Sequence, residues 1–185
     1  MVKFNYEEFS NNMTQQAKDV IPEDISPPNA NYLIDTIRKF TLLAGEVIEN
    51  DSEFNFSLDD KVFVIQVLAE WTFHKCVDLA RSDIPNKYWD SIMQKLAFTI
   101  YEICRQGRHR EDVDKDALLN AVEYHVNKVW VECIDKLKND NKIDNKCAKL
   151  AKTLSNIDDM AKLEQAKRNN CKDKKETKKE PILKK

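Results

Sequence analysis

Residues 58–80 combine an almost continuous apolar pattern with a regular line of polar side chains. Phe63 and Phe73 fall on the half of the predicted helix where an ordinary surface helix carries charged residues. Polar residues recur there every four positions, so a helix would place them close together on one side. They are Gln66, Glu70, His74 and Asp78. We therefore expect either an interior site or the centre of a contact surface along this line.

Helical periodicity recurs along most of the chain and predicts an all-α protein. Shorter amphipathic helices are expected at residues 6–20 and 147–161, before and after a set of longer ones. The longer helices are expected at residues 31–49, 58–82, 87–106 and 115–138. The simplest arrangement is an antiparallel bundle of these four core helices, with the additional helices at its N- and C-terminal ends.

Residues with special local chemistry predict where these helices begin and end. Ser57 and Asp114 have side chains that can cap the helices that follow them. Gly107 is the expected C-cap of the helix before it. The proline-rich segment 22–28 predicts an extended connector, since proline is excluded from helix interiors.

The same signals divide the chain into three parts. Residues 1–28 are expected to form an N-terminal helical arm and the proline-rich connector, and residues 29–168 the helical bundle domain. Residues 169–185 have a low-complexity, lysine-rich composition that predicts a disordered basic tail.

Glycine content excludes several classes of protein. The chain of 185 residues has only two glycines, Gly45 and Gly107. Hairpin-rich β folds, phosphate-binding P-loops and dinucleotide fingerprints all need glycine where the backbone adopts positive φ or approaches phosphate. None of these folds or motifs is expected.

Cysteine usage and the N-terminal sequence indicate a compartment. The five cysteines form no C-x-x-C pair and lie mostly among apolar residues, as small core residues do in reducing compartments. Residues 1–12 are acidic and lack the apolar core of a signal peptide, and no uncharged run is long enough to span a bilayer. We therefore expect a cytoplasmic protein that does not enter the membrane.

Charge is distributed unevenly, although the net charge is only −2. Residues 1–140 contain 16 Lys and Arg against 25 Asp and Glu, whereas residues 141–185 contain 14 against 7. An acidic body thus carries a basic C-terminal region with a net charge of +7. This region has no aromatic residues to stack on bases, so we expect it to solubilise the chain or fold back on the body rather than to bind nucleic acid.

Glu70 and His74 could hold a metal ion or a small molecule, with His125 contributed by a facing helix. Carboxylate-bridged di-iron bundles need E-x-x-H units on separate helices, and neither this motif nor H-E-x-x-H occurs. A hydrogen-bonded or interface histidine is the simpler interpretation, so no cofactor or metal is expected.

Arg105, Arg108 and Arg110 form a cationic cluster at a predicted helix end and the loop after it. They could bind a phosphate or an acidic peptide, and together with the basic tail they could bind a phosphate-rich or nucleic-acid partner. Acidic residues follow at once, between positions 111 and 116, and can neutralise the cluster. Local ion pairing explains the cluster equally well.

The sequence contains no G-x-S-x-G or S-x-x-K motif, so no catalytic residue is assigned. It also contains no helix-turn-helix pattern, the motif of many DNA-binding proteins. It does contain apolar residues outside the stripes that a simple bundle would bury, among them Leu42. We therefore expect a non-enzymatic helical-bundle protein that acts through contacts with an unidentified protein partner or a second copy, as an adaptor, regulator or small chaperone. The expected interface consists of Phe63, Gln66, Glu70, Phe73, His74 and Phe98.

Overall fold

The computed structural model describes residues 4–109 and 114–154, and these residues contain helices and no strands. The all-α prediction is therefore confirmed. Residues 145–154 are helical and begin the last predicted helix, whose remainder lies outside the described residues together with the tail at 169–185. The other elements are α1 (Tyr6–Asp19), α2 (Pro27–Asn50), α3 (Leu58–Arg81), the 3₁₀ turn η1 (Asn86–Tyr88), α4 (Trp89–His109) and α5 (Lys115–Asn139).

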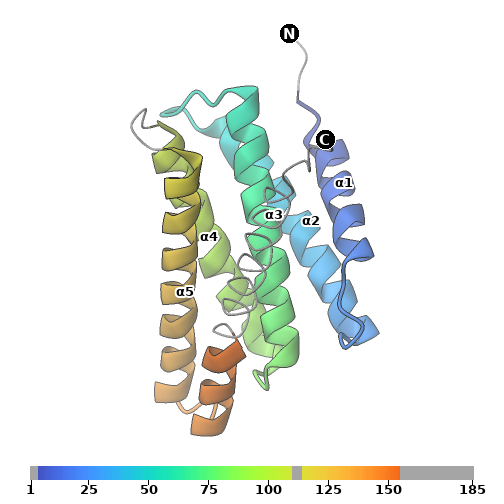
Figure 1. The fold of residues 1–185 in the computed structure, drawn as a ribbon, viewed down its shortest axis with the longest axis vertical. Helices are drawn as coiled ribbons and strands as arrows, with labels where there is room; N and C mark the ends of the chain where they lie inside the picture. The colour runs from blue at the N-terminus through green and yellow to red at the C-terminus, as the bar shows by residue number, and fades with distance from the viewer. Residues whose placement is uncertain (1–3, 110–113, 155–185) are drawn as a thin grey trace, which may run out of the picture.

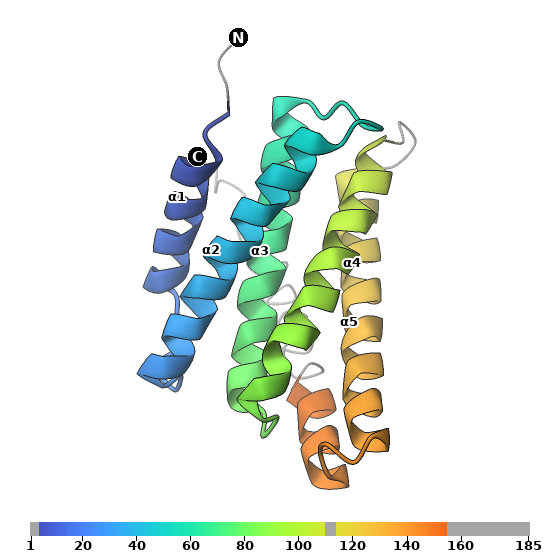
Figure 2. The same ribbon diagram turned by 180° about the vertical axis from the view of Figure 1, so that it is seen from behind.

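The long helices pack in the order in which they occur along the chain. In the described residues, the main packed pairs are α1 with α2, α2 with α3, α3 with α4, and α4 with α5. Figures 1 and 2 show that successive helices run up and down the long axis of the molecule. Because α2 and α5 are not among these pairs, the predicted four-helix core is not confirmed.

Local side-chain chemistry accounts for the starts of three helices. The Ser57 side chain accepts a hydrogen bond from the Asp60 amide at 3.2 Å, and the Asp114 side chain accepts one from the Ala117 amide at 2.7 Å. The side chain of Asn5 caps α1 in the same way. Each bond satisfies one amide that has no partner within its helix. The predicted caps at Ser57 and Asp114 are confirmed.

Two predicted helix boundaries are wrong. Helix α2 begins at Pro27 rather than near residue 31, because proline fits the first turn of a helix, where its missing N–H group is not needed. Helix α4 continues through Gly107 to His109, so this glycine is not a C-cap. A Cβ atom at Gly107 would collide with the Leu118 side chain. Glycine is used there for the close approach of α4 and α5.

Thr72 of α3 carries a buried hydroxyl group with no hydrogen-bond partner, whereas the Thr41 hydroxyl of α2 is 2.6 Å from the hydroxyl of Ser10 in α1. We expect Thr72→Val to stabilise the protein by about 1 kcal/mol, because it removes an unsatisfied polar group and keeps a β-branched side chain. The free energy of unfolding in urea, followed by circular dichroism, measures this effect.

Thr41→Val is the matched control for Thr72→Val. It should destabilise the protein by about 1–2 kcal/mol, since the buried Ser10 hydroxyl loses its partner in α2. Destabilisation of both variants to the same extent would contradict the interpretation of Thr72.

Candidate functional site

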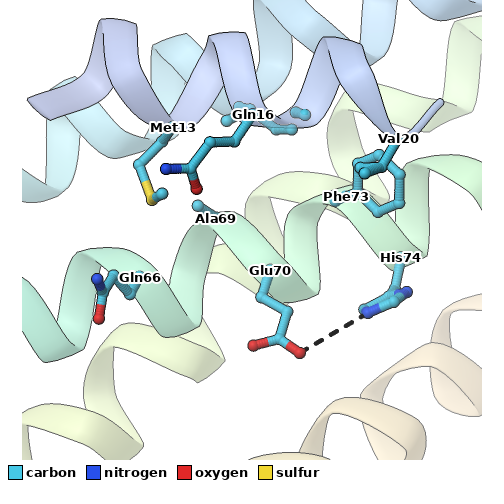
Figure 3. Close-up of a pocket in the computed structure, with 10 residues that line it drawn as sticks. Met13, Gln16, Val20, Gln66, Ala69, Glu70, Phe73 and His74 are labelled. Atoms are coloured by element: carbon cyan, nitrogen blue, oxygen red, sulfur yellow. Dashed lines mark ion pairs between the residues drawn. The ribbon is translucent and has the colours of Figure 1, made fainter.

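A groove of about 580 Å³ separates α1 from α3 and has Ile37 of α2 in its lining. We call it the α1–α3 groove. Figure 3 shows α1 along one side of it, and Gln66, Glu70 and His74 of the predicted polar line of α3 along the other. Its labelled lining residues are Met13 and Gln16 from α1, Val20 directly after α1, and Gln66, Ala69, Glu70, Phe73 and His74 from α3. The N-terminal helix thus lies beside the surface on which the sequence placed an interface.

Glu70 and His74 form a loose pair at the edge of this groove. His74 Nε2 lies 3.9 Å from Glu70 Oε1, and the two side chains are 32% and 70% exposed. The ring of Phe73 stands edge-on to the imidazole, with 5.7 Å between the ring centroids. A solvated pair at this distance is weak. The geometry therefore fits a histidine at a surface better than one that is enclosed for catalysis.

The four residues of the polar line do not lie on one face of α3. Four residues advance an α-helix by slightly more than one turn, so each step of four rotates the side chain by about 40°. Gln66 and Glu70 are exposed, His74 is half-buried and Asp78 is buried. Asp78 instead pairs with Lys75 inside the protein, with 3.1 Å between its Oδ2 and Lys75 Nζ.

The remaining residues of the predicted interface lie elsewhere. Phe63 is half-buried, and the cationic groups of Arg108 and Lys115 each lie 5.5 Å from its ring centroid. Phe98 is exposed on α4 and lines a different groove. The six residues predicted as one interface are therefore found at three separate places.

The residues of the alternative metal site are not brought together. His125 is exposed on α5, and its ring lies edge-on to that of Tyr124 at a centroid distance of 5.1 Å. In residues 4–109 and 114–154, no group of three or more His, Cys, Asp and Glu side chains is placed to hold a metal ion.

Of the two described arginines of the cationic cluster, Arg105 binds the segment between α2 and α3, and Arg108 binds the first turn of α3. Arg105 Nε donates to Asp51 Oδ2 at 2.6 Å, and its guanidinium group lies 3.9 Å from the ring centroid of Phe54. Arg108 Nε donates to Asp60 Oδ1 at 2.6 Å. Both arginines are thus ion-paired with residues about fifty positions earlier. Glu111 and Asp112, the first acidic residues after the cluster, lie outside the described residues. Arg110 lies outside the described residues.

Asp51 should make the stability of the protein depend on acidic pH. The hydrogen bond from Arg105 holds the pKa of its carboxyl group below the ordinary value. A carboxylate with a lowered pKa contributes its full stabilisation above the unfolded value of about 3.9, and this contribution is lost as pH falls through the lower folded value.

We expect Asp51→Asn to be less stable than wild type at pH 7 and the two proteins to converge as pH falls below about 4. Thermal unfolding between neutral and strongly acidic pH measures this difference. Asp59→Asn, an exposed carboxylate nearby, is the control and should show a smaller pH-dependent difference. A constant difference between wild type and Asp51→Asn at every pH would contradict the prediction.

A second groove, of about 310 Å³, lies between α2 and α4 and has Leu68 of α3 in its lining. We call it the α2–α4 groove. Figure 2 shows α2 and α4 on either side of α3 in this view. Three large apolar side chains around it are exposed: Leu43 by 43%, Val47 by 48% and Phe98 by 67%. The sequence identified Phe98 as part of an interface, but it also placed Leu42 outside the buried stripes, whereas Leu42 is half-buried.

The α2–α4 groove continues into an acidic end. A site of about 640 Å³ shares Val47, Tyr101 and Glu102 with the groove. The Tyr101 hydroxyl donates to Asp51 Oδ2 at 3.3 Å, and burial together with this carboxylate raises the pKa of Tyr101 to about 12. The charged residues of the site are Glu46, Asp51, Glu53, Glu102 and Arg105. The lining formed by the described residues thus has four carboxylates and one guanidinium group.

The chain matches no protein-family model, no curated protein and no solved structure. Over the part of the chain that the structure describes, no helix is both long and apolar enough to cross a lipid bilayer.

Proposed function

We propose that this is a non-enzymatic cytoplasmic protein that acts as an adaptor, regulator or small chaperone by binding another protein in the α2–α4 groove. The observation that supports this proposal is the group of exposed apolar side chains around one concave surface, namely Leu43, Val47 and Phe98. Clustered exposed apolar side chains are typical of binding surfaces, whereas single ones are common on any protein.

The shape of the groove favours a helix as the bound element. Helices α2 and α4 flank α3, so a further helix can lie between them and add to the layer that they form (Figure 2). Leu43 and Val47 are four residues apart and so lie one above the other along α2. An amphipathic partner helix meets such a surface with apolar residues at positions i, i+3 or i+4, and i+7.

Phe98→Asp tests this proposal most directly. Burying one large apolar side chain contributes about 1.5–3 kcal/mol, so the variant should bind the partner about 10- to 100-fold more weakly. The partner would be isolated by affinity capture, and its affinity for the wild-type chain measured with both proteins purified. Light scattering after size-exclusion chromatography shows whether the partner is a second copy.

Tyr124→Asp is the matched control, since Tyr124 is a similarly exposed aromatic residue on α5, outside the groove. It should bind like wild type. Equal affinity of Phe98→Asp and Tyr124→Asp for the captured partner would contradict the proposed docking surface.

A small-molecule site is the second candidate. The α1–α3 groove, at about 580 Å³, has the size of many ligand pockets. It combines apolar walls from Met13 and Phe73 with polar groups from Gln66, Glu70 and His74. Native mass spectrometry of the purified protein would detect a retained ligand, and Phe73→Asp should abolish its retention. Recovery of ligand-free protein from several expression hosts would count against this candidate.

A further inference from the structure

We infer that the helix bound in the α2–α4 groove carries an apolar stripe followed by a cluster of Lys or Arg at the end that reaches the C-terminus of α2. This inference rests on the proposed function, because it names the partner chemistry of the same groove. It follows from the charges and distances at the acidic end of that groove.

The carboxylates at this end outnumber the cations. Among the described residues, Arg105 is the single basic one in the lining, and it lies within 2.6 Å of a carboxylate oxygen of both Asp51 and Glu53. Glu102 Oε2 is 3.9 Å from the same guanidinium group, and Glu46 is exposed. One guanidinium group offsets one of the four carboxylates, so the lining formed by residues 4–109 and 114–154 keeps a net charge of −3.

The end of α2 adds to this negative potential. The carbonyl end of a helix carries a partial negative charge, which Lys or Arg in the last turn usually offsets. The last turn of α2 has no basic residue. Glu46 lies near this terminus and faces the site, so the helix dipole and the side-chain charges act in the same direction. A cationic side chain placed there would interact favourably with both.

The length of the surface along α2 matches that of one short partner helix. The apolar part begins at Phe40 and the acidic part ends at Asn50 on α2. At 1.5 Å per residue, these positions are about 15 Å apart along the helix. A partner helix of about three turns spans that length, with its basic residues one turn beyond its apolar residues.

A second copy of the chain fits this surface less well. Residues 1–140 carry nine more acidic than basic residues, so self-association would bring two acidic surfaces together. The basic region at residues 141–185 of the same chain, at +7, is the other source of cations. A synthetic peptide from this region is therefore included as a competitor in the test.

The experiment uses two synthetic amphipathic peptides of the same length with the same leucine stripe. One ends in three lysines and the other in three glutamates. Fluorescence anisotropy measures the affinity of each peptide for the full chain at low and high salt. We expect the lysine peptide to bind at least about 10-fold more tightly at low salt, with the difference shrinking as salt screens the charges.

Glu46→Gln combined with Glu102→Gln removes two charges and should abolish most of the preference for the lysine peptide. Glu123→Gln with Glu132→Gln on α5 makes the same charge change outside both parts of the site and should leave the preference intact. Phe98→Asp should weaken binding of both peptides.

Each remaining outcome overturns a defined part of the proposal. Equal binding of the two peptides, lost in Phe98→Asp, overturns the basic partner and supports the docking groove. Binding of neither peptide overturns both. A peptide of residues 165–185 that displaces the lysine peptide, and depends on Glu46 and Glu102 in the same way, identifies the chain's own C-terminal region as the occupant and overturns the partner.

Discussion

Replacing Asp78 with alanine is expected to destabilise the protein by about 3–5 kcal/mol, because the Lys75 ammonium group then remains buried without this carboxylate. Lys75 is 3% exposed and Asp78 is 2% exposed, and Lys75 Nζ lies 3.1 Å from Asp78 Oδ2. Lys75 Nζ also lies 5.0 Å from the centroid of the Trp130 ring. Such a loss is a large part of the 5–15 kcal/mol that stabilises an ordinary domain.

Urea unfolding followed by circular dichroism measures this loss, and two variants separate charge from packing. Lys75→Met with Asp78→Leu removes both charges and keeps apolar volume, so it should cost much less than Asp78→Ala. Lys61→Met breaks the more exposed pair with Glu49 and should cost less than about 1 kcal/mol. A cost for Asp78→Ala as small as that for Lys61→Met would contradict the prediction.

The sequence predicted those parts of the fold that depend on neighbouring residues. Ser57 and Asp114 cap helices because each side chain reaches an amide three positions later, and this spacing is visible in the sequence. Gly107 was misassigned because a glycine near a helix end usually marks a C-cap. Its use depends instead on the distance to Leu118 in α5, which is set by the packing of two helices.

The sequence could not give the relative positions of residues that come from different helices. Phe98 was recognised as an unusual exposed residue, but its neighbours Leu43 and Val47 come from α2, about fifty positions earlier. The partners of Arg105 and Arg108 come from a similar distance along the chain. Periodicity gives the face of one helix and not its register against another. A four-residue spacing also drifts around the helix, which separates Asp78 from Glu70.

The second large effect is expected for Trp130→Ala, which should destabilise the protein by about 3–5 kcal/mol. Trp130 is fully buried in α5. Its indole Nε1–H donates to the carbonyl oxygen of Ala151 at 3.3 Å, so it also joins α5 to the helix at residues 145–154. Removing the ring leaves a cavity that the surrounding helices can fill only in part. Urea unfolding measures the loss.

Trp130→Phe separates the packing of the ring from its hydrogen bond. Phenylalanine fills most of the volume but has no N–H group for the Ala151 carbonyl, so the global cost should fall to about 1–2 kcal/mol. Amide hydrogen exchange should become faster in residues 145–154 and stay unchanged in α2, because α3 lies between α2 and this helix (Figures 1 and 2). Equal destabilisation by alanine and phenylalanine would show that the hydrogen bond, and not the filled volume, is the main contribution of Trp130.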